Sequence, residues 1–276
     1  MPKVFLNGEI VDEGDARVPV TDRGLLFADA VYEVVRVYGG EPFLWREHMA
    51  RMERGARFLQ IPLPFGPEEL KGYALELIDL NECYLGVVYI QLTRGPAPRV
   101  HRFPERVRPT AFMFTQEVAR PDRELVRRGV DLVTLPDVRW GLCEVKTVGL
   151  LPNVLGKEEA AKRGAFDALF VRDGVITEGT SSNFFAVRNG RLVTYPVDNI
   201  LPGVTRAKVL EIAGRLGLEV QERGLEVDEL RDCEEAFLTG TVLEVMPVRS
   251  VDGIELGPPG PVTRRLLEEY EGLIEA

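Results

Sequence analysis

Tight-turn signals between short apolar segments are the feature that most limits what this chain can fold into. They occur at Asn7-Gly8, Gly39-Gly40, Arg172-Asp173-Gly174 and Asn189-Gly190. Asn, Asp and Gly accept the positive backbone φ angles that two-residue hairpin turns need. Each signal therefore predicts a β-hairpin, so the chain is expected to form sheets with many antiparallel neighbours.

The rest of the pattern alternates further strands with helices. Apolar, β-branched segments predict strands at 4–11 (a hairpin), 30–38, 41–44, 84–93, 109–114, 130–135, 166–171, 175–177, 184–187, 191–195, 218–222, 235–239 and 245–250. Apolar residues at helical spacing predict helices at 45–60, 67–80, 122–128, 152–163, from the 201–205 turn to 216, at 227–231 and at 261–274. Because strands, helices and hairpins are mixed in this way, we expect an α/β (α+β) fold with largely antiparallel or mixed sheets.

The length of 276 residues is enough for two hydrophobic cores. The polar segment EVARPD at 117–122 contains a proline and is the predicted linker. We therefore expect a smaller N-terminal α/β domain at 1–116 and a larger C-terminal domain at 123–276.

Charge and cysteine usage exclude several functional classes. A net charge of −10 argues against general binding to nucleic acid or membrane surfaces. No apolar run approaches the roughly 20 residues that cross a bilayer, and the first residues do not resemble a signal peptide. Cys83, Cys143 and Cys233 are odd in number and far apart, which indicates free thiols in the cytoplasm. With only His48 and His101, a histidine-built metal site is not expected.

Lys146 is the first candidate for chemistry. It lies within the largely apolar segment DVRWGLCEVKTVGLLPNVLGKEEA at 137–160 and is one of only six lysines. Apolar surroundings disfavour the charged ammonium, so its pKa is expected to fall and the neutral amine to become accessible. Such an amine can form a Schiff base. The alternative is a lysine whose stem lies on apolar surface while its ammonium reaches water.

Hydroxyl-rich turns form a second group of candidates. Glu178 precedes Gly-Thr-Ser-Ser-Asn, and its carboxylate could accept a hydrogen bond from a protonated heterocyclic nitrogen. The segment 203–205 (Gly-Val-Thr) opens a predicted helix whose exposed amides suit a phosphate group. The segment 239–241 (Thr-Gly-Thr) offers a similar turn. Ordinary roles in turns and helix caps are the alternatives.

Basic residues form the third group. Arg51 lies in an arginine-rich helix, for which a solvated face is the alternative reading. Arg99 and His101 are one residue apart in a proline-rich loop, so in an extended segment their side chains point the same way. Two such donors suit a carboxylate, and a mobile surface loop is the alternative.

Taken together, these segments resemble the class IV aminotransferases, the pyridoxal-phosphate enzymes of fold type IV, essentially from end to end. The matching segments are VYEVVRVYGGEPF, EHMARM, QLTRGPAPRVHRFP, DVRWGLCEVKTVGLLPNVLGKEEA, TEGTSSNFF, LPGVTR and LTGTVLEVMPV. Within this family the chain is most similar to members that act on D-amino acids. The resemblance implies two mixed α/β domains with the cofactor site between them, and residues 123–276 as the domain that binds pyridoxal 5'-phosphate.

The resemblance also implies roles for individual residues. Lys146 would be the catalytic lysine that forms the Schiff base and shuttles the proton, and Glu178 would hold the pyridine nitrogen protonated. The implied cofactor ligands beyond these two are Arg51, Val204, Thr205 and Thr241 at the phosphate, with Arg139 and Ser181 or Ser182 beside the ring. The implied ligands of the substrate carboxylate are Tyr32, Arg99 and His101. In the family this loop reaches the partner's site, so the resemblance implies a homodimer.

The implied reaction is transamination between D-amino acids of the D-alanine or D-glutamate type and 2-oxo acids such as 2-oxoglutarate and pyruvate. The Arg99-x-His101 pair favours it over the alternatives of the same fold, a branched-chain L-amino-acid aminotransferase or a 4-amino-4-deoxychorismate lyase. The chain departs from frequent family residues at Ala28, Ala30, Gly149 and Gly240. These departures bear on kinetic detail and substrate breadth more than on reaction type.

Overall fold

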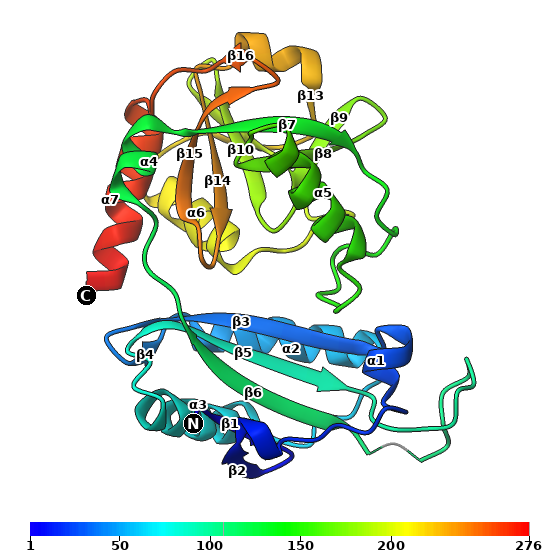
Figure 1. Cartoon of the computed structure of the whole chain (residues 1–276). Helices are drawn as coiled ribbons and strands as arrows, with labels where there is room; N and C mark the ends of the chain where they lie inside the picture. Colours follow the sequence, from blue (N-terminus) through cyan, green and yellow to red (C-terminus); the bar gives the residue numbers. More distant parts are fainter. Residues whose placement is uncertain (107, 276) are drawn as a thin grey trace. The chain divides into compact units, whose positions relative to one another are not determined.

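The computed structural model describes residues 1–106 and 108–275 (Figure 1). The chain divides into two compact units. Unit 1 contains Met1–Ala119 and Val145–Gly149, and unit 2 contains Arg120–Glu144 and Leu150–Ala276. The short segment around Lys146 therefore belongs to unit 1, although the residues on both sides of it belong to unit 2.

Unit 1 is a six-stranded sheet covered by helices (Figure 1). Its strands follow the order β2-β1-β6-β5-β3-β4, and every pairing is antiparallel. The strands are β1 (Lys3–Leu6), β2 (Glu9–Asp12), β3 (Ala30–Tyr38), β4 (Glu41–Pro42), β5 (Leu85–Thr93) and β6 (Thr110–Glu117). The helices are η1 (Glu13–Asp15, a 3-10 turn), α1 (Arg23–Phe27), α2 (Trp45–Phe58) and α3 (Pro67–Leu80).

The hairpin predicted at the start of the chain is confirmed. Leu6 lies opposite Glu9 across the turn, so the loop consists of Asn7 and Gly8 alone. Both residues have positive φ, 53° and 99°, which is the geometry that selects this dipeptide. The resulting register turns Phe5 into the core, where it is fully buried.

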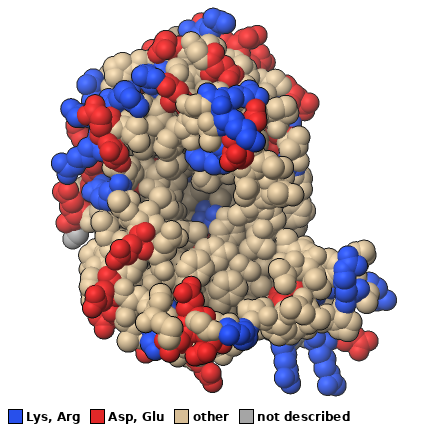
Figure 2. All heavy atoms as spheres, viewed as in Figure 1, with Lys and Arg blue, Asp and Glu red and all other residues tan. Residues whose placement is uncertain are grey.

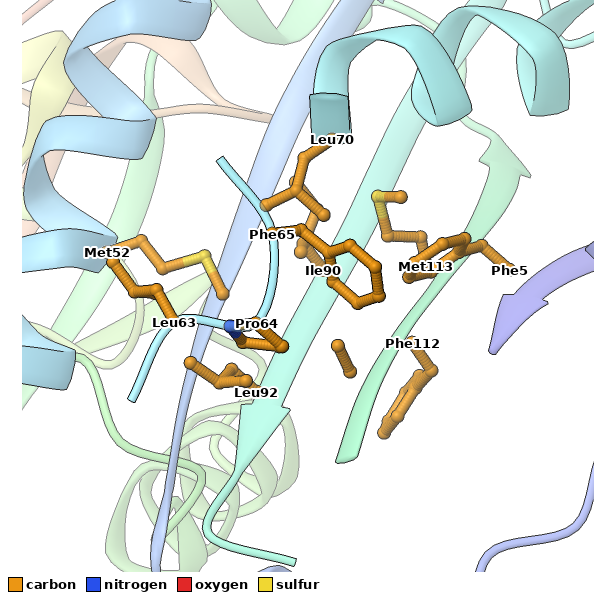
Figure 3. Close-up of a pocket in the computed structure, with 11 residues that line it drawn as sticks. Phe5, Met52, Leu63, Pro64, Phe65, Leu70, Ile90, Leu92, Phe112 and Met113 are labelled. Atoms are coloured by element: carbon orange, nitrogen blue, oxygen red, sulfur yellow. The ribbon is translucent and has the colours of Figure 1, made fainter. Parts of the chain in front are cut away.

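The core of unit 1 follows from the alternation of β3. Val31, Val35 and Val37 are buried against α2, from which Met49 and Met52 pack on the same side. A small cavity lies within this core between Met52, Phe65 and Leu92 (Figure 3). All of its lining side chains are apolar, so it offers no group for chemistry and reflects imperfect packing.

Unit 2 is built on a ten-stranded mixed sheet. The strand order is β12-β11-β10-β14-β15-β7-β8-β9-β13, with β16 paired to β15. The strands are β7 (Val130–Pro136), β8 (Asp167–Arg172), β9 (Val175–Gly179), β10 (Asn183–Arg188), β11 (Arg191–Thr194), β12 (Val220–Glu222), β13 (Leu225–Glu226), β14 (Glu235–Gly240), β15 (Glu244–Val251) and β16 (Ile254–Glu255). The helices are α4 (Arg123–Arg128), α5 (Leu151–Lys162), α6 (Val204–Arg215), η2 (Val227–Asp232, 3-10) and α7 (Pro261–Glu275).

The predicted fold class is confirmed in detail. β7 runs parallel to β8 and to β15, β11 runs parallel to β12, and the other pairings of unit 2 are antiparallel. The hairpins predicted at Asp173-Gly174 and Asn189-Gly190 join β8 to β9 and β10 to β11. In the part of the chain that the structure describes, there is no helix with the length and apolar character of a membrane span.

Several local predictions are wrong. The strand expected at 41–44 ends at Pro42, and the one expected at 109–114 continues to Glu117, which lies at the start of the expected linker. The short helix α1 falls in a segment expected to be a loop. The strand pieces β13 and β16 are two residues each and carry no periodic signal.

Candidate functional site

Lys146 is held beside β3 of unit 1. The backbone of Thr147 forms a bridge with Val31, and the Tyr32 amide donates to the Lys146 carbonyl at 3.1 Å. The preceding side chain, Val145, is buried in the core of unit 1. These contacts fix the backbone on both sides of the lysine, and its Nζ lies 4.2 Å from the centroid of the Tyr32 ring.

Tyr32 is a neutral, well-oriented group next to this amine. Its ring stacks against Tyr89, with ring centroids 5.6 Å apart. Burial, helped by the negative charge of Glu33, raises the pKa of Tyr32 to about 12. The phenol therefore keeps its proton at neutral pH and is available as a hydrogen-bond donor.

Arg51 is buried in unit 1 and oriented by a carboxylate. Its Nε and Nη2 donate to the two oxygens of Glu33 at 2.8 and 2.7 Å. His48 Nδ1 lies 2.8 Å from the same carboxylate. Burial alone would raise the pKa of Glu33, but the charge and hydrogen bonds of Arg51 outweigh it and lower the pKa to about 2. Glu33 is thus ionised and holds the guanidinium in one orientation.

The pKa of His48 reflects its burial and the charged groups around it. Burial is the main cause that lowers its pKa, and the positive charges of Arg51 and Lys146 lower it further. The hydrogen bond with Glu33 and the negative charge of that carboxylate oppose these effects. His48 is therefore expected to stay neutral near pH 7.

Glu178 is the centre of a second polar cluster, in unit 2. It lies in β9 and is 3% exposed. Its carboxylate accepts from Arg139 Nη1, from Asn183 Nδ2 at 3.0 Å and from the Leu201 amide at 3.1 and 3.2 Å. Burial nevertheless outweighs Arg139 and raises the pKa of Glu178 to about 7. An additional cationic N–H donor would therefore favour its ionised form.

Arg139 is shared between two carboxylates. It donates to Glu178 and, through Nε and Nη2, to Asp137 at 3.0 and 2.9 Å. Asp137 also accepts from Arg172 Nη2 at 2.8 Å. Burial alone would lower the pKa of Arg139, but the hydrogen bond to Asp137 and the charge of Glu178 outweigh it and raise the pKa, so the guanidinium stays charged.

The turn that follows Glu178 contributes hydroxyl groups. The Oγ of Ser182 is buried and has no hydrogen-bond partner among the residues that the structure describes. A Cβ on Gly240 would lie 3.4 Å from the Ser181 carbonyl oxygen and 3.8 Å from Ser182 Cβ. The turn that carries Gly240 and Thr241 therefore lies against Ser181 and Ser182, as membership of a common site would require.

The start of α6 completes the cluster in unit 2. Its N-cap is Gly203, which has no side-chain cap, and no acidic residue lies in the first turn. Val204 and Thr205 are buried, and their amides belong to the unpaired first turn. A 12-residue helix that begins this way presents bare N–H groups and the positive end of its dipole, both of which favour an anion.

Arg99 and His101 lie in the loop between β5 and β6, whose basic side chains other than His101 are arginines; Figure 2 shows arginine and lysine side chains in blue. Both residues are exposed, and both side chains lie near the ring of Phe27. The Arg99 guanidinium carbon is 5.4 Å from the Phe27 centroid, and the His101 ring centroid is 5.5 Å from it. The two groups therefore have the Phe27 ring as a common neighbour.

The structure brings the candidate residues together in three groups. Unit 1 contains Tyr32, Arg51 and Lys146, and its β5–β6 loop contains Arg99 and His101. Unit 2 contains Arg139, Glu178, Ser181, Ser182, Val204, Thr205 and Thr241.

The residues that orient these groups were not predicted from the sequence. Glu33 had a detectable signal: it interrupts valines on the buried face of a strand, and a carboxylate there needs a cationic partner. Asn183 and Asp137 had no such signal, although Asp137 binds Arg139 only two residues away and Asn183 binds Glu178 from the next strand.

Comparison with known proteins identifies the family of this chain. Residues 30–251 match the family model described as amino-transferase class IV. The chain is 40% identical to the D-alanine aminotransferase of Bacillus licheniformis over 96% of this chain and 94% of that protein. It is 41% identical to the D-alanine aminotransferase of Staphylococcus aureus strain MSSA476 over 100% and 99%.

A solved structure is similar over the same extent. The branched-chain amino acid aminotransferase of T.th., determined with pyridoxamine 5'-phosphate, gives a TM-score of 0.89 at 31% identity, covering 99% of this chain and 93% of that chain. These matches show that the protein belongs to amino-transferase class IV, a class of pyridoxal-phosphate-dependent enzymes.

Proposed function

We propose that this enzyme transfers amino groups between D-amino acids of the D-alanine or D-glutamate type and 2-oxo acids, namely pyruvate and 2-oxoglutarate. The observation that carries this proposal is the full-length similarity to D-alanine aminotransferases. It is supported by Arg99 and His101, whose side chains both lie near the Phe27 ring. Two donors that share one neighbouring ring suit a carboxylate.

The residues of unit 2 fit pyridoxal 5'-phosphate. Burial leaves the Glu178 carboxylate in need of a further cationic donor, which a protonated pyridine nitrogen provides. Ser182 Oγ is buried without a partner among the described residues, so it gains a hydrogen bond from a polar ligand. The uncapped start of α6 offers amides to a phosphate.

When bound at this site, pyridoxal phosphate would be joined to the substrate's amino group in place of the lysine and would withdraw electrons from the substrate Cα, which makes the Cα proton acidic. The Lys146 amine, freed by that exchange, would take the proton from Cα and return one at the C4′ position. Tyr32 and the bridge to Val31 keep this amine in place. Because the amine acts from one face only, the hand of the substrate depends on where its carboxylate is bound.

The other residues of the site bind and orient. Glu178, held by Asn183 and Arg139, keeps the ring nitrogen protonated, and Ser181 or Ser182 supports the ring. The phosphate is bound by the amides of Val204 and Thr205, the hydroxyl groups of Thr205 and Thr241, and the guanidinium of Arg51, whose orientation Glu33 fixes.

The substrate carboxylate is bound by Arg99, His101 and the Tyr32 hydroxyl. We infer a homodimer in which the β5–β6 loop serves the partner's site. Residues 123–276 would act as the cofactor-binding domain and residues 1–116 as the smaller domain. The three cysteines are free, and we infer a cytoplasmic location from them.

A branched-chain L-amino-acid aminotransferase is the second candidate. It is favoured by the similarity to the T.th. enzyme over 99% of this chain. The two candidates differ in the stereochemistry of the amino acid that they accept, so one assay with both D- and L-amino acids separates them.

The test is a panel of D- and L-amino acids with 2-oxoglutarate and pyruvate, followed by the formation of each 2-oxo acid. We expect turnover of D-alanine and D-glutamate, no turnover in Lys146→Ala, and a raised KM in Arg99→Ala. Faster conversion of L-leucine than of D-alanine would overturn the proposal in favour of the second candidate.

A further inference from the structure

The backbone of the loop that carries Arg99 and His101 is anchored by Arg23 from α1. Arg23 Nη1 donates to the Val100 carbonyl at 2.6 Å and to the Arg102 carbonyl at 3.5 Å. Its Nη2 donates to the His101 carbonyl at 3.4 Å. One guanidinium thus contacts three successive carbonyls of an otherwise exposed segment.

Arg23 is itself held in a buried position. It is 3% exposed, and its Nε donates to Asp29 at 2.8 Å. Asp29 also accepts from Arg94 at 2.7 and 2.9 Å, and Arg94 donates to the carbonyls of Leu59 and Gln60. Burial alone would raise the pKa of Asp29, but the hydrogen bonds of Arg94 and Arg23 outweigh it and lower the pKa. Asp29 is therefore ionised, and its partner Arg94 connects it to the backbone of Leu59 and Gln60.

The same short helix supports the loop side chains. Phe27, at the end of α1, is the ring against which Arg99 and His101 lie, and the Arg23 guanidinium carbon is 4.7 Å from its centroid. At the start of α1, Asp22 accepts from the hydroxyl groups of Thr93 and Thr110, the residues that end β5 and begin β6. Helix α1 therefore contacts both the base and the middle of the loop.

Fixing three consecutive carbonyls restricts the backbone that carries His101 and directly follows Arg99. A loop with exposed side chains and several prolines has many alternative backbone conformations, and ordering it at the moment of binding lowers affinity. Holding the carbonyls of Val100, His101 and Arg102 on Arg23 removes that cost before substrate arrives. The backbone from which the side chains of Arg99 and His101 project is then already ordered.

We propose that Arg23 and Asp29 are positioning residues that preorganise the Arg99–His101 loop for the substrate carboxylate. This inference rests on the proposed function of the loop. They would act through the backbone of residues 100–102, to which Arg23 donates.

The experiment compares Arg23→Gln and Asp29→Asn with the matched control Arg57→Gln, which removes an exposed arginine from α2. Steady-state rates of the holoenzyme with D-alanine give KM and kcat. We expect KM to rise about tenfold or more in both variants with kcat changed much less, because ground-state binding is what the anchor supports. The control is expected to match wild type.

Limited trypsin digestion supplies a readout that does not depend on activity. Arg99 and Arg102 are exposed cleavage sites within the anchored segment. Their cleavage is expected to accelerate about tenfold in Arg23→Gln, since local opening governs proteolysis. The absorbance of bound cofactor is expected to stay at the wild-type value.

Equal KM and equal cleavage rates in Arg23→Gln and Arg57→Gln would overturn the inference. If wild type does not turn over D-amino acids, the proposed function fails, but the cleavage rates still decide whether Arg23 orders the loop. If Arg23→Gln does not fold, Arg23→Lys replaces it: lysine retains the ion pair with Asp29 but not the planar contact with three carbonyls, so the same two changes are expected.

Discussion

Gly203 and the side chain of Asn183 are in direct contact at the start of α6. A Cβ on Gly203 would lie only 2.0 Å from Asn183 Oδ1. Asn183 in turn donates to Glu178 and to the Leu201 carbonyl at 3.0 and 2.9 Å. Because Gly203 has no Cβ, Asn183 can pack against the start of α6 while it donates to the buried carboxylate of Glu178.

Replacing Gly203 by alanine is therefore expected to weaken cofactor binding without removing any polar group. The added methyl must displace Asn183, and with it Glu178 loses a donor. A displacement near 1 Å in such a site costs up to roughly 100-fold in function. Titration of the cofactor-free protein with pyridoxal phosphate, followed by absorbance, measures the loss. Gly214→Ala is the matched control, because a Cβ on Gly214 meets nothing within 4 Å.

The raised pKa of Glu178 predicts a pH-dependent stability of the cofactor-free protein. A carboxyl with a folded pKa of about 7 and a usual value of 4.5 contributes stability below pH 4.5 that is lost as pH rises to 7. The loss amounts to about 3 kcal/mol, at ~1.4 kcal/mol for each unit of pKa. Urea unfolding of Glu178→Gln across this range should lack that slope, and identical slopes for both proteins would contradict the assignment.

Glu33 predicts the opposite dependence. Its pKa is lowered from 4.5 to about 2, so its ion pair with Arg51 stabilises the protein above pH 4.5, and this stabilisation is lost as pH falls to 2. At pH 7 Glu33→Gln is expected to be about 3–5 kcal/mol less stable than wild type, because Arg51 is left buried without its anion. The difference should shrink below pH 4.5 in denaturant titrations. Glu47→Gln, an exposed change on α2, should have little effect at any pH.

Glu235 predicts a stability effect away from the site. Its carboxylate accepts from the amides of Val262 and Thr263 at 3.1 and 2.7 Å and so caps α7 from a neighbouring strand. Glu235→Ala is expected to cost roughly 1–2 kcal/mol of unfolding free energy, the usual value of a lost cap. Transaminase activity at room temperature should remain. If Glu268→Ala, an exposed change on α7, costs as much, the capping role is wrong.

Elements whose signals are local could be predicted from the sequence. The bounds of β3 and α3 match the expected 30–38 and 67–80, because the first is a β-branched run ended by two glycines and the second begins at a proline with an acidic first turn. Helix α1 could not be predicted. It has five residues and is anchored by contacts of Asp22 with Thr93 and Thr110, which are 71 and 88 residues away.

The same distinction holds for the candidate site. Glu178, Lys146 and the Gly203 turn stand out by residue type and by their neighbours in the chain. The groups that orient them come from elsewhere: Glu33 reaches Arg51 from a strand 18 residues earlier, and Arg139 reaches Glu178 across 39 residues. Such pairs depend on sheet register and helix packing, which periodicity alone does not specify.

The membership of Val145–Gly149 in unit 1 has a consequence for exchanging parts between related enzymes. The chain leaves unit 1 after Ala119, returns at Val145 and leaves again after Gly149. A chimaera joined once, near residue 120, would import its lysine with the foreign half, yet that lysine's neighbour Val145 must fill the core of the native half beside Val31 and Gly55. Working hybrids of this fold are therefore expected to need the segment Val145–Gly149 from the same parent as β3.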